Sequence, residues 1–225
     1  RTRDANMHHL AGMLTERGID LKEVRIVSDV HEDIVAAVNA LRSRWDHVFT
    51  SGGIGPTHDD ITSDAVAAAF ETPIDVRDDA RAILAAHYER SGLELNAARL
   101  RMARIPDGAS LIENPVSFAP GFQIGNVHVM AGVPKIFQAM LEGALATMQG
   151  GAPLVSKTLR VEQGEGDIAG VLGDLADRHP ELSVGSYPFQ RDGKFAVNVV
   201  IRGTDGDAVQ GAVNELAGAL GMTIA

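Results

Sequence analysis

Hydrophobic residues recur at helical and strand spacings along the first 150 residues of the chain. Met7, Leu10, Ala11 and Leu14 lie on one helical face, and Gly18 follows where a helix-terminating glycine is expected. Similar patterns predict helices at residues 32–44, 63–70, 75–91, 96–104 and 135–148, and strands at 21–27, from 48 onward, 122–125 and 127–130. This alternation predicts an α/β fold with a Rossmann-like, three-layer parallel sheet.

The residues Gly150, Gly151, Ala152 and Pro153 interrupt the alternation and predict a domain boundary. Strands are then expected at 156–161, 184–189 and 195–202, and helices at 167–176 and 205–220. The turn Arg191-Asp192-Gly193 between two alternating runs predicts a hairpin. We therefore expect an α/β domain over residues 1–150 and a small ferredoxin-like α+β domain over residues 154–225.

Composition narrows the function classes. The 225 residues carry a net charge of −10 and 45% hydrophobic residues, so no basic patch is available for nucleic acid. The absence of cysteine excludes disulfides and thiolate metal sites, and an intracellular, cytoplasmic location is the default expectation. No run of about 18 apolar residues suggests a membrane span, and no leader segment is visible.

The most informative stretch combines three glycines, a Pro-Thr turn and two aspartates ahead of a helix. Gly52, Gly53 and Gly55 lack β-carbons where a backbone would approach a ligand, and their amides with the helix N-terminus favour an anion. Asp59 and Asp60 beside an anion site are expected to hold a divalent cation, Mg²⁺ or a similar ion. The alternative is that either aspartate only caps the following helix.

Two further loops are candidates for the same pocket. Residues 114–122 are too apolar for an ordinary exposed loop, although a rigid turn would explain their prolines. Pro134 after Gly132 begins a helix whose free amides form a second candidate phosphate site. Arg99, Arg101 and Arg104 could also bind phosphate, but a solvated face or a subunit contact is the more common use of such a run.

Asp29 has two possible roles. With Glu32 it fits a capping box at the start of the next helix. It also follows a predicted strand, at the edge where open α/β sheets bind ligands. Both roles are compatible with its position.

The sequence of residues 52–62, Gly-Gly-Ile-Gly-Pro-Thr-His-Asp-Asp-Ile-Thr, resembles the signature of the competence/damage-inducible protein A (CinA) family. It is more loosely similar to the glycine loop of the molybdopterin-binding (MoaB/Mog-like) domains of molybdenum-cofactor biosynthesis. Residues 114–122 resemble a second motif of the same family, with Ser117 in place of the usual glycine, and Ala131 replaces a usual proline. Compared with that family, the first strand and a C-terminal amidohydrolase domain would be missing from this chain.

The resemblance implies a pocket for a phosphate-bearing pterin, such as molybdopterin, or for an adenine nucleotide. It implies metal-dependent hydrolysis of a nucleotide pyrophosphate of the ADP-ribose or FAD type. The alternatives are adenylylation of molybdopterin, and a module that binds such ligands without chemistry. A homo-oligomer, dimer or trimer, is expected by the same resemblance.

On this reading Asp59 and Asp60 would hold the metal, and Asp29 and Asp60 would be catalytic. The residues expected to bind the ligand and its phosphates are Ser51, Gly52, Gly53, Gly55, Pro56, Thr57, Thr62, Asn114, Pro115, Ala119, Pro120, Gly121, Gly132 and Pro134.

Overall fold

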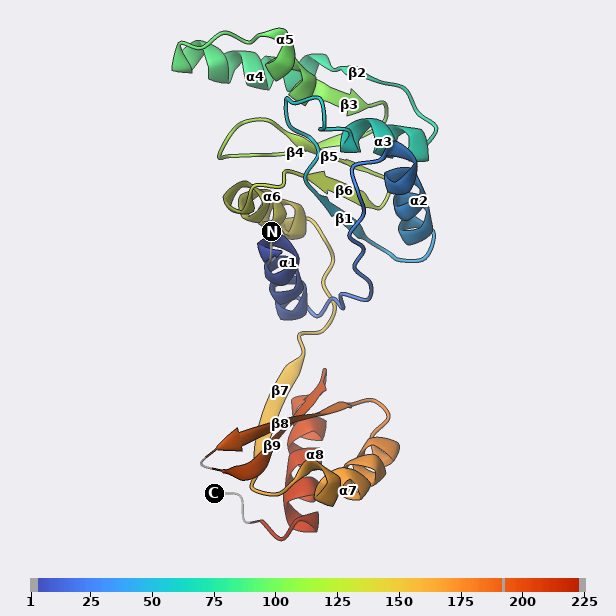
Figure 1. The fold of residues 1–225 in the computed structure, drawn as a ribbon, viewed down its shortest axis with the longest axis vertical. Coiled ribbons are helices and arrows are strands. Elements are labelled where there is room, and N and C mark those ends of the chain that lie inside the picture. Colours follow the sequence, from blue (N-terminus) through green and yellow to red (C-terminus); the bar gives the residue numbers. More distant parts are fainter. Residues whose placement is uncertain (1–3, 192, 223–225) are drawn as a thin grey trace. The chain divides into compact units, whose positions relative to one another are not determined.

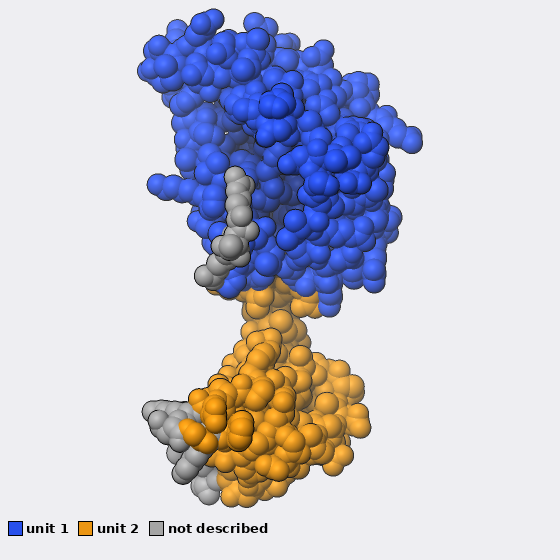
Figure 2. Space-filling view, in the orientation of Figure 1, with its two compact units in different colours: residues 1–12, 21–149 blue, residues 13–20, 150–225 orange. Residues whose placement is uncertain are grey.

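The computed structural model describes residues 4–191 and 193–222, which form two compact units (Figures 1 and 2). The first unit comprises residues 1–12 and 21–149, and the second comprises residues 13–20 and 150–225. Residues 13–20 belong to the second unit because Gly150 and Gly151, at its start, lie against their backbone. A β-carbon on Gly151 would lie 2.4 Å from the Gly18 carbonyl oxygen. Helix α1 (Ala5–Glu16) ends before Gly18, whose φ of +66° confirms it as the terminating glycine.

The sheet of the first unit has four strands in the order β1-β6-β5-β4. They are β1 (Val48–Ser51), β4 (Ser110–Ile112), β5 (Gly121–Ile124) and β6 (Val127–Met130). β1 and β6 run parallel, whereas β5 pairs antiparallel with both β6 and β4. The α/β class is confirmed, but the sheet is mixed, because a tight turn at Gly125 (φ +54°) forces β5 and β6 into a hairpin.

Helices cover both faces of this sheet (Figure 1). Val127 and Val129 of β6 face one core, shared with α2 (His31–Arg42) and α3 (Thr62–Ala69). The opposite face is covered by α6 (Pro134–Ala146), whose Met140 approaches Gly121 of β5. Because successive side chains of a strand point to opposite faces of the sheet, each strand contributes side chains to both helical layers.

A small lobe follows α3. Its strands β2 (Ile74–Val76) and β3 (Arg104–Pro106) pair antiparallel, and between them lie α4 (Asp78–Ser91), α5 (Ala97–Leu100) and the 3₁₀-helix η1 (Arg101–Ala103). The sequence predicted helices up to the outer ends of this segment, at residues 75 and 104. Those ends are strands instead, because residues 74–76 and 104–106 pair with each other across the lobe. β3 also packs against α3.

The expected strand at residues 21–27 is wrong: no strand is present between α1 and α2. Its alternating apolar residues are not covered, since Ile26 is 86% exposed and Val24 is 50% exposed. A strand needs a paired edge and one buried face, and this segment has neither within the described residues.

The second unit has the predicted order of strand, helix, strand, strand and helix. The elements are β7 (Val155–Val161), α7 (Glu165–Arg178), β8 (Ser183–Arg191), β9 (Lys194–Gly203) and α8 (Gly206–Ala219). The strands pair antiparallel in the order β7-β9-β8, and alternate residues of β9 such as Val199 and Ile201 face an aliphatic core with both helices. Asp192, in the predicted hairpin turn, lies outside the described residues. Across the residues described in both units, no helix combines the length and apolarity that crossing a bilayer requires.

Candidate functional site

Two of the predicted phosphate-binding loops meet at one edge of the sheet. β1 and β6 are parallel neighbours, so their carboxyl ends lie side by side, and the Gly52 N–H donates to the Met130 carbonyl at 2.9 Å. A β-carbon on Gly132 would lie 3.0 Å from the Gly52 Cα. The glycine loop and the loop before Pro134 therefore contact each other backbone to backbone, at the edge where open α/β sheets bind ligands.

The glycines have an internal structural reason. Gly53 has a φ of +71°, and a β-carbon on it would lie 2.0 Å from the Thr62 hydroxyl oxygen. The Gly53 carbonyl accepts the Thr62 N–H at 2.9 Å, which ties the loop to the start of α3 and leaves Thr62 buried. A β-carbon on Gly55 would lie 2.6 Å from Asp60 Oδ2. Glycine is thus required for the loop to fold over the aspartate, before any ligand is considered.

The two aspartates converge on one hydroxyl. Thr57 Oγ1 lies 2.5 Å from Asp59 Oδ1 and 2.6 Å from Asp60 Oδ2, and the Thr57 N–H donates to Asp60 Oδ2 at 2.9 Å. The Thr57 hydroxyl is the largest cause that lowers the pKa of Asp59 below its ordinary value. Neither aspartate caps α3, whose N-cap Ile61 has no side-chain cap bond. The carboxylates are instead held at the loop, beside the exposed Pro56.

The carboxylate pair fits a metal that is shared with a ligand. No group of three or more His, Cys, Asp or Glu side chains suited to a metal ion occurs among the described residues. Mg²⁺ does not need one, since it keeps several waters and is commonly bound through one or two carboxylates plus phosphate oxygens. Asp59 and Asp60 supply that donor set, provided that the ligand carries phosphate.

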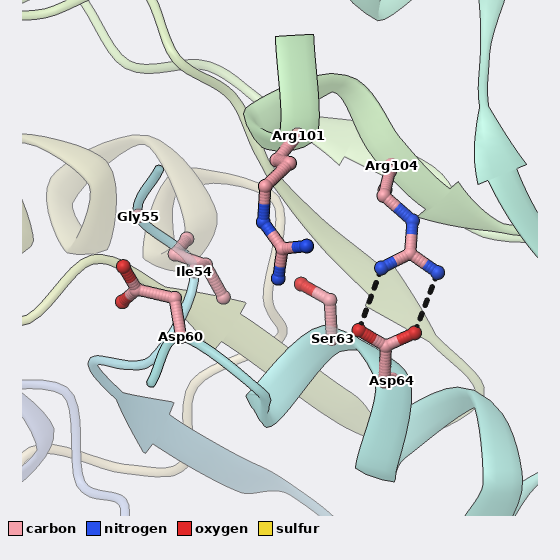
Figure 3. A pocket seen from close by; sticks show the side chains of 7 residues that line it. All are labelled: Ile54, Gly55, Asp60, Ser63, Asp64, Arg101 and Arg104. Carbon is pink, nitrogen blue, oxygen red and sulfur yellow. Dashed lines mark hydrogen bonds and ion pairs between the residues drawn. The ribbon is translucent and has the colours of Figure 1, made fainter. Parts of the chain in front are cut away.

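A hollow opens between this loop, the start of α3 and the small lobe (Figure 3). Its lining from the loop and the helix consists of Ile54, Gly55, Asp60, Ser63 and Asp64. Arg101 and Arg104 complete it from η1 and β3. The lobe therefore brings cationic side chains to the glycine loop from about 40 residues further along the chain.

Asn6 of α1 was not singled out from the sequence, yet it joins the two loops. Asn6 is only 5% exposed, and its Nδ2 donates to Ser51 Oγ at 2.7 Å and to the Gly132 carbonyl at 2.8 Å. Its Oδ1 is buried without a hydrogen-bond partner. Its position on the otherwise apolar face of α1 was the feature of the sequence from which it could have been predicted.

Asp29 stands apart from these contacts. It is exposed, in a bend before α2, and the N-cap of that helix is Val30 without a side-chain cap bond. The capping box with Glu32 is not formed; Ser28 Oγ donates to Asp33 Oδ2 instead, at 3.1 Å. Within the described residues no hydrogen bond or ion pair joins Asp29 to Asp59 or Asp60.

The residues of the 114–122 loop serve the loop itself. Asn114 Oδ1 accepts the Val116 and Ser117 amides at 3.1 and 3.0 Å, and its Nδ2 donates to Ser117 Oγ and the Ala119 carbonyl at 2.6 and 2.8 Å. Every hydrogen-bonding position of the Asn114 amide is therefore used. Pro115 is exposed, whereas Pro120 and Gly121 are buried, and none of these residues lines the hollow beside Asp60.

Comparison with known proteins identifies the family of each part of the chain. Residues 1–149 match the family described as "Probable molybdopterin binding domain", and residues 153–225 match "FAD synthase, middle domain". The crystal structure of CinA from Thermoplasma acidophilum, whose function is stated as unknown, is 32% identical, with a TM-score of 0.59 over 65% of this chain and 88% of that chain.

Curated relatives of several lengths are also similar. Protein PF0476 of Pyrococcus furiosus is 33% identical over 94% of this chain and 88% of its own. A CinA-like protein of Myxococcus xanthus is 33% identical over 81% of this chain, and the chain spans 46% of that protein's length. A protein of Caldivirga maquilingensis is 35% identical over 66% of this chain, which spans 60% of it. The chain thus belongs to the family of probable molybdopterin-binding domains, among its CinA-like members.

Proposed function

We propose that this chain binds a phosphate-bearing adenine nucleotide or pterin at the glycine loop and hydrolyses a nucleotide pyrophosphate with a divalent cation. The observation that carries the proposal is the convergence of Asp59 and Asp60 on the Thr57 hydroxyl, beside a loop with unused backbone donors. Within the described residues, the N–H groups of Gly53, Ile54 and Gly55 donate no hydrogen bond. A concave run of free amides is a favourable anion site.

The chain's own residues have distinct roles in this proposal. Asp59 and Asp60 would hold the cation, and Thr57 orients both carboxylates by its hydroxyl and its amide. A bound cation would neutralise phosphate charge and favour ionisation of a water molecule. The free amides of the loop bind the phosphate oxygens and stabilise the charge that develops there. Water adds to one phosphorus, the bridging P–O bond breaks, and two phosphate monoesters leave.

We include Asp29 as a further acidic group that would position water, because the resemblance to the CinA family implies a functional aspartate in this loop. Its exposed place before α2 gives it no fixed contact with the loop, so its contribution is a prediction for mutagenesis.

Two other functions use the same atoms. Adenylylation of molybdopterin would transfer AMP from ATP to the pterin phosphate, so that one pyrophosphate bond forms, the α–β bond of ATP breaks and pyrophosphate leaves. The names of both matched families favour a pterin or an adenine dinucleotide as ligand. A binding module without chemistry is favoured by one observation: the free amides account for phosphate binding without any metal.

The test is product analysis by chromatography after incubation with ADP-ribose, FAD or NAD, each with and without Mg²⁺, Mn²⁺ or Co²⁺. We expect AMP to be released only with metal, and D60N and D60A to lower the rate at least about 100-fold with the fold intact. D29N is measured alongside, and D78N, an exposed aspartate at the start of α4, is the matched control.

Unchanged turnover in D60N would remove Asp60 from the mechanism. No product from any substrate, with metal-independent binding of AMP or molybdopterin in calorimetry, would overturn hydrolysis in favour of the binding module.

A further inference from the structure

The three arginines that follow α4 have different environments, which the sequence did not distinguish. Arg99 lies over the ring of Tyr88, 4.7 Å from its centroid, and donates to the Glu94 carbonyl at 2.5 Å. Arg104 forms a two-pronged ion pair with Asp64, with N···O distances of 2.6 and 2.7 Å. Both guanidinium groups are therefore engaged within the protein.

Arg101 has no such partner. Among the described residues it forms no ion pair, and its Nε is buried without a hydrogen-bond acceptor. Its side chain extends from η1 into the hollow, toward Ser63 and Ile54, as Figure 3 shows. A buried N–H without an acceptor is destabilising, and a guanidinium carries five donors in a fork that matches phosphate oxygens.

The wall that Arg101 faces is also a donor surface. The backbone N–H groups of Ser63 and Asp64, in the first turn of α3, donate no hydrogen bond within the described residues. The Asp64 carboxylate, which would repel an anion, is compensated by Arg104. The residues that line the hollow thus include the unpaired cation Arg101, two residues of α3 with free amides, and Asp60 with part of the glycine loop.

Two sets of unused donors belong to residues that line the same hollow, and a diphosphate carries two neighbouring anionic groups of the kind that such donors bind. One set is the free amides of Ile54 and Gly55, near Asp60. The other is Arg101 with the start of α3. We propose that Arg101 holds the second phosphate of a diphosphate ligand and so makes the site prefer a pyrophosphate over a monophosphate. This inference rests on the proposed function because it assumes that the ligand carries phosphate. It does not require that the ligand is hydrolysed.

The test compares the affinities of the 225-residue chain for ADP-ribose and for AMP by calorimetry in EDTA, where the proposed metal-dependent hydrolysis does not consume the ADP-ribose. We expect R101Q to weaken ADP-ribose binding about 10- to 100-fold and AMP binding at most about threefold, because a charge-assisted fork is lost at one phosphate only. R101K, which keeps the charge but not the fork, should fall between. R99Q is the matched control, since Arg99 lies in the same segment but against Tyr88. Fluorescence of Trp45, the one tryptophan, checks that each variant is folded.

The outcomes separate this inference from the proposed hydrolysis. An Arg101-dependent preference for ADP-ribose without any turnover would support the inference and overturn the hydrolase. Metal-dependent AMP release with the same KM and the same ADP-ribose preference in R101Q would overturn the inference and leave the hydrolase standing. A wild-type chain that does not distinguish ADP-ribose from AMP would also overturn it.

Discussion

The two units of this chain differ in what they bury. Asn6, Thr62, Asn114 and His128, the buried polar residues of the described chain, all belong to the first unit. The second unit is built around aliphatic side chains such as Ile201, and its charged groups pair at the surface. Among the described residues, buried polar side chains, which are costly to bury, therefore belong to the first unit.

The same division holds for buried polar atoms without a partner. Within the described residues these are Asn6 Oδ1, His9 Nε2, Thr50 Oγ1, Arg101 Nε and His128 Nδ1, and all lie in the first unit. Each such atom costs about 1–3 kcal/mol, so the first unit bears a cost in stability that the described residues of the second unit do not. The glycine loop and Arg101, which form the proposed ligand site, lie in this first unit.

The largest expected effect is on stability, at Gly53. G53A adds a β-carbon at a φ of +71° and 2.0 Å from the Thr62 hydroxyl oxygen, so we expect a loss of about 3 kcal/mol or more in the unfolding free energy of the first unit. In contrast, G170A lies in the exposed face of α7 with no atom near its β-carbon, and should stabilise the second unit by up to about 1 kcal/mol. Urea unfolding followed by Trp45 fluorescence and by hydrogen exchange separates the units. Equal changes in unfolding free energy for G53A and G170A would contradict this difference between the two units.

A smaller effect is expected from His128 of β6. Burial, with His47 nearby, lowers its pKa from 6.5 to about 4, and its ring stacks on Phe49 at 4.9 Å. The unfolded chain then binds more protons below pH 6.5, so stability is complete above that pH and falls as the pH drops towards 4. Between pH 8 and pH 5 we expect a loss of about 2 kcal/mol, which H128F should abolish. The measurement is the urea midpoint of Trp45 fluorescence at both pH values. A wild-type loss that H128F retains would assign it to other groups.

The smallest effect is expected in the second unit. His179 Nε2 lies 2.9 Å from Glu215 Oε2, and this hydrogen bond raises the pKa of His179 above its ordinary value. Any stability from the pair is present below the ordinary histidine pKa and is lost as the pH rises through the raised one. E215Q should lower the pKa of His179 in an NMR titration and leave the unfolding midpoint at pH 8 unchanged, because Glu215 is exposed and His179 is partly exposed, so water screens the pair. A large shift of that midpoint would contradict the view of the second unit as a surface-paired, apolar-cored domain.

Sequence reasoning succeeded where local chemistry decides. Gly18 was recognisable as a helix-terminating glycine because a positive φ angle selects glycine, and the helices with long apolar stripes were found within a few residues of their ends. It failed at residues 21–27, where an alternating pattern exists without a sheet edge to pair with. It also missed β2 and β3, since three residues are too few to show a period and only their mutual pairing makes them strands.

The sequence by itself determined the order of elements in the second unit and the identity of the loop that carries the glycines and the carboxylate pair. These follow from periodicity and from backbone geometry over short distances along the chain. Only the tertiary structure decided that the loop meets Gly132 and Asn6 at parallel strand ends. It likewise decided which of three nearby arginines faces the site. Both depend on contacts between residues far apart in the chain, which no local pattern encodes.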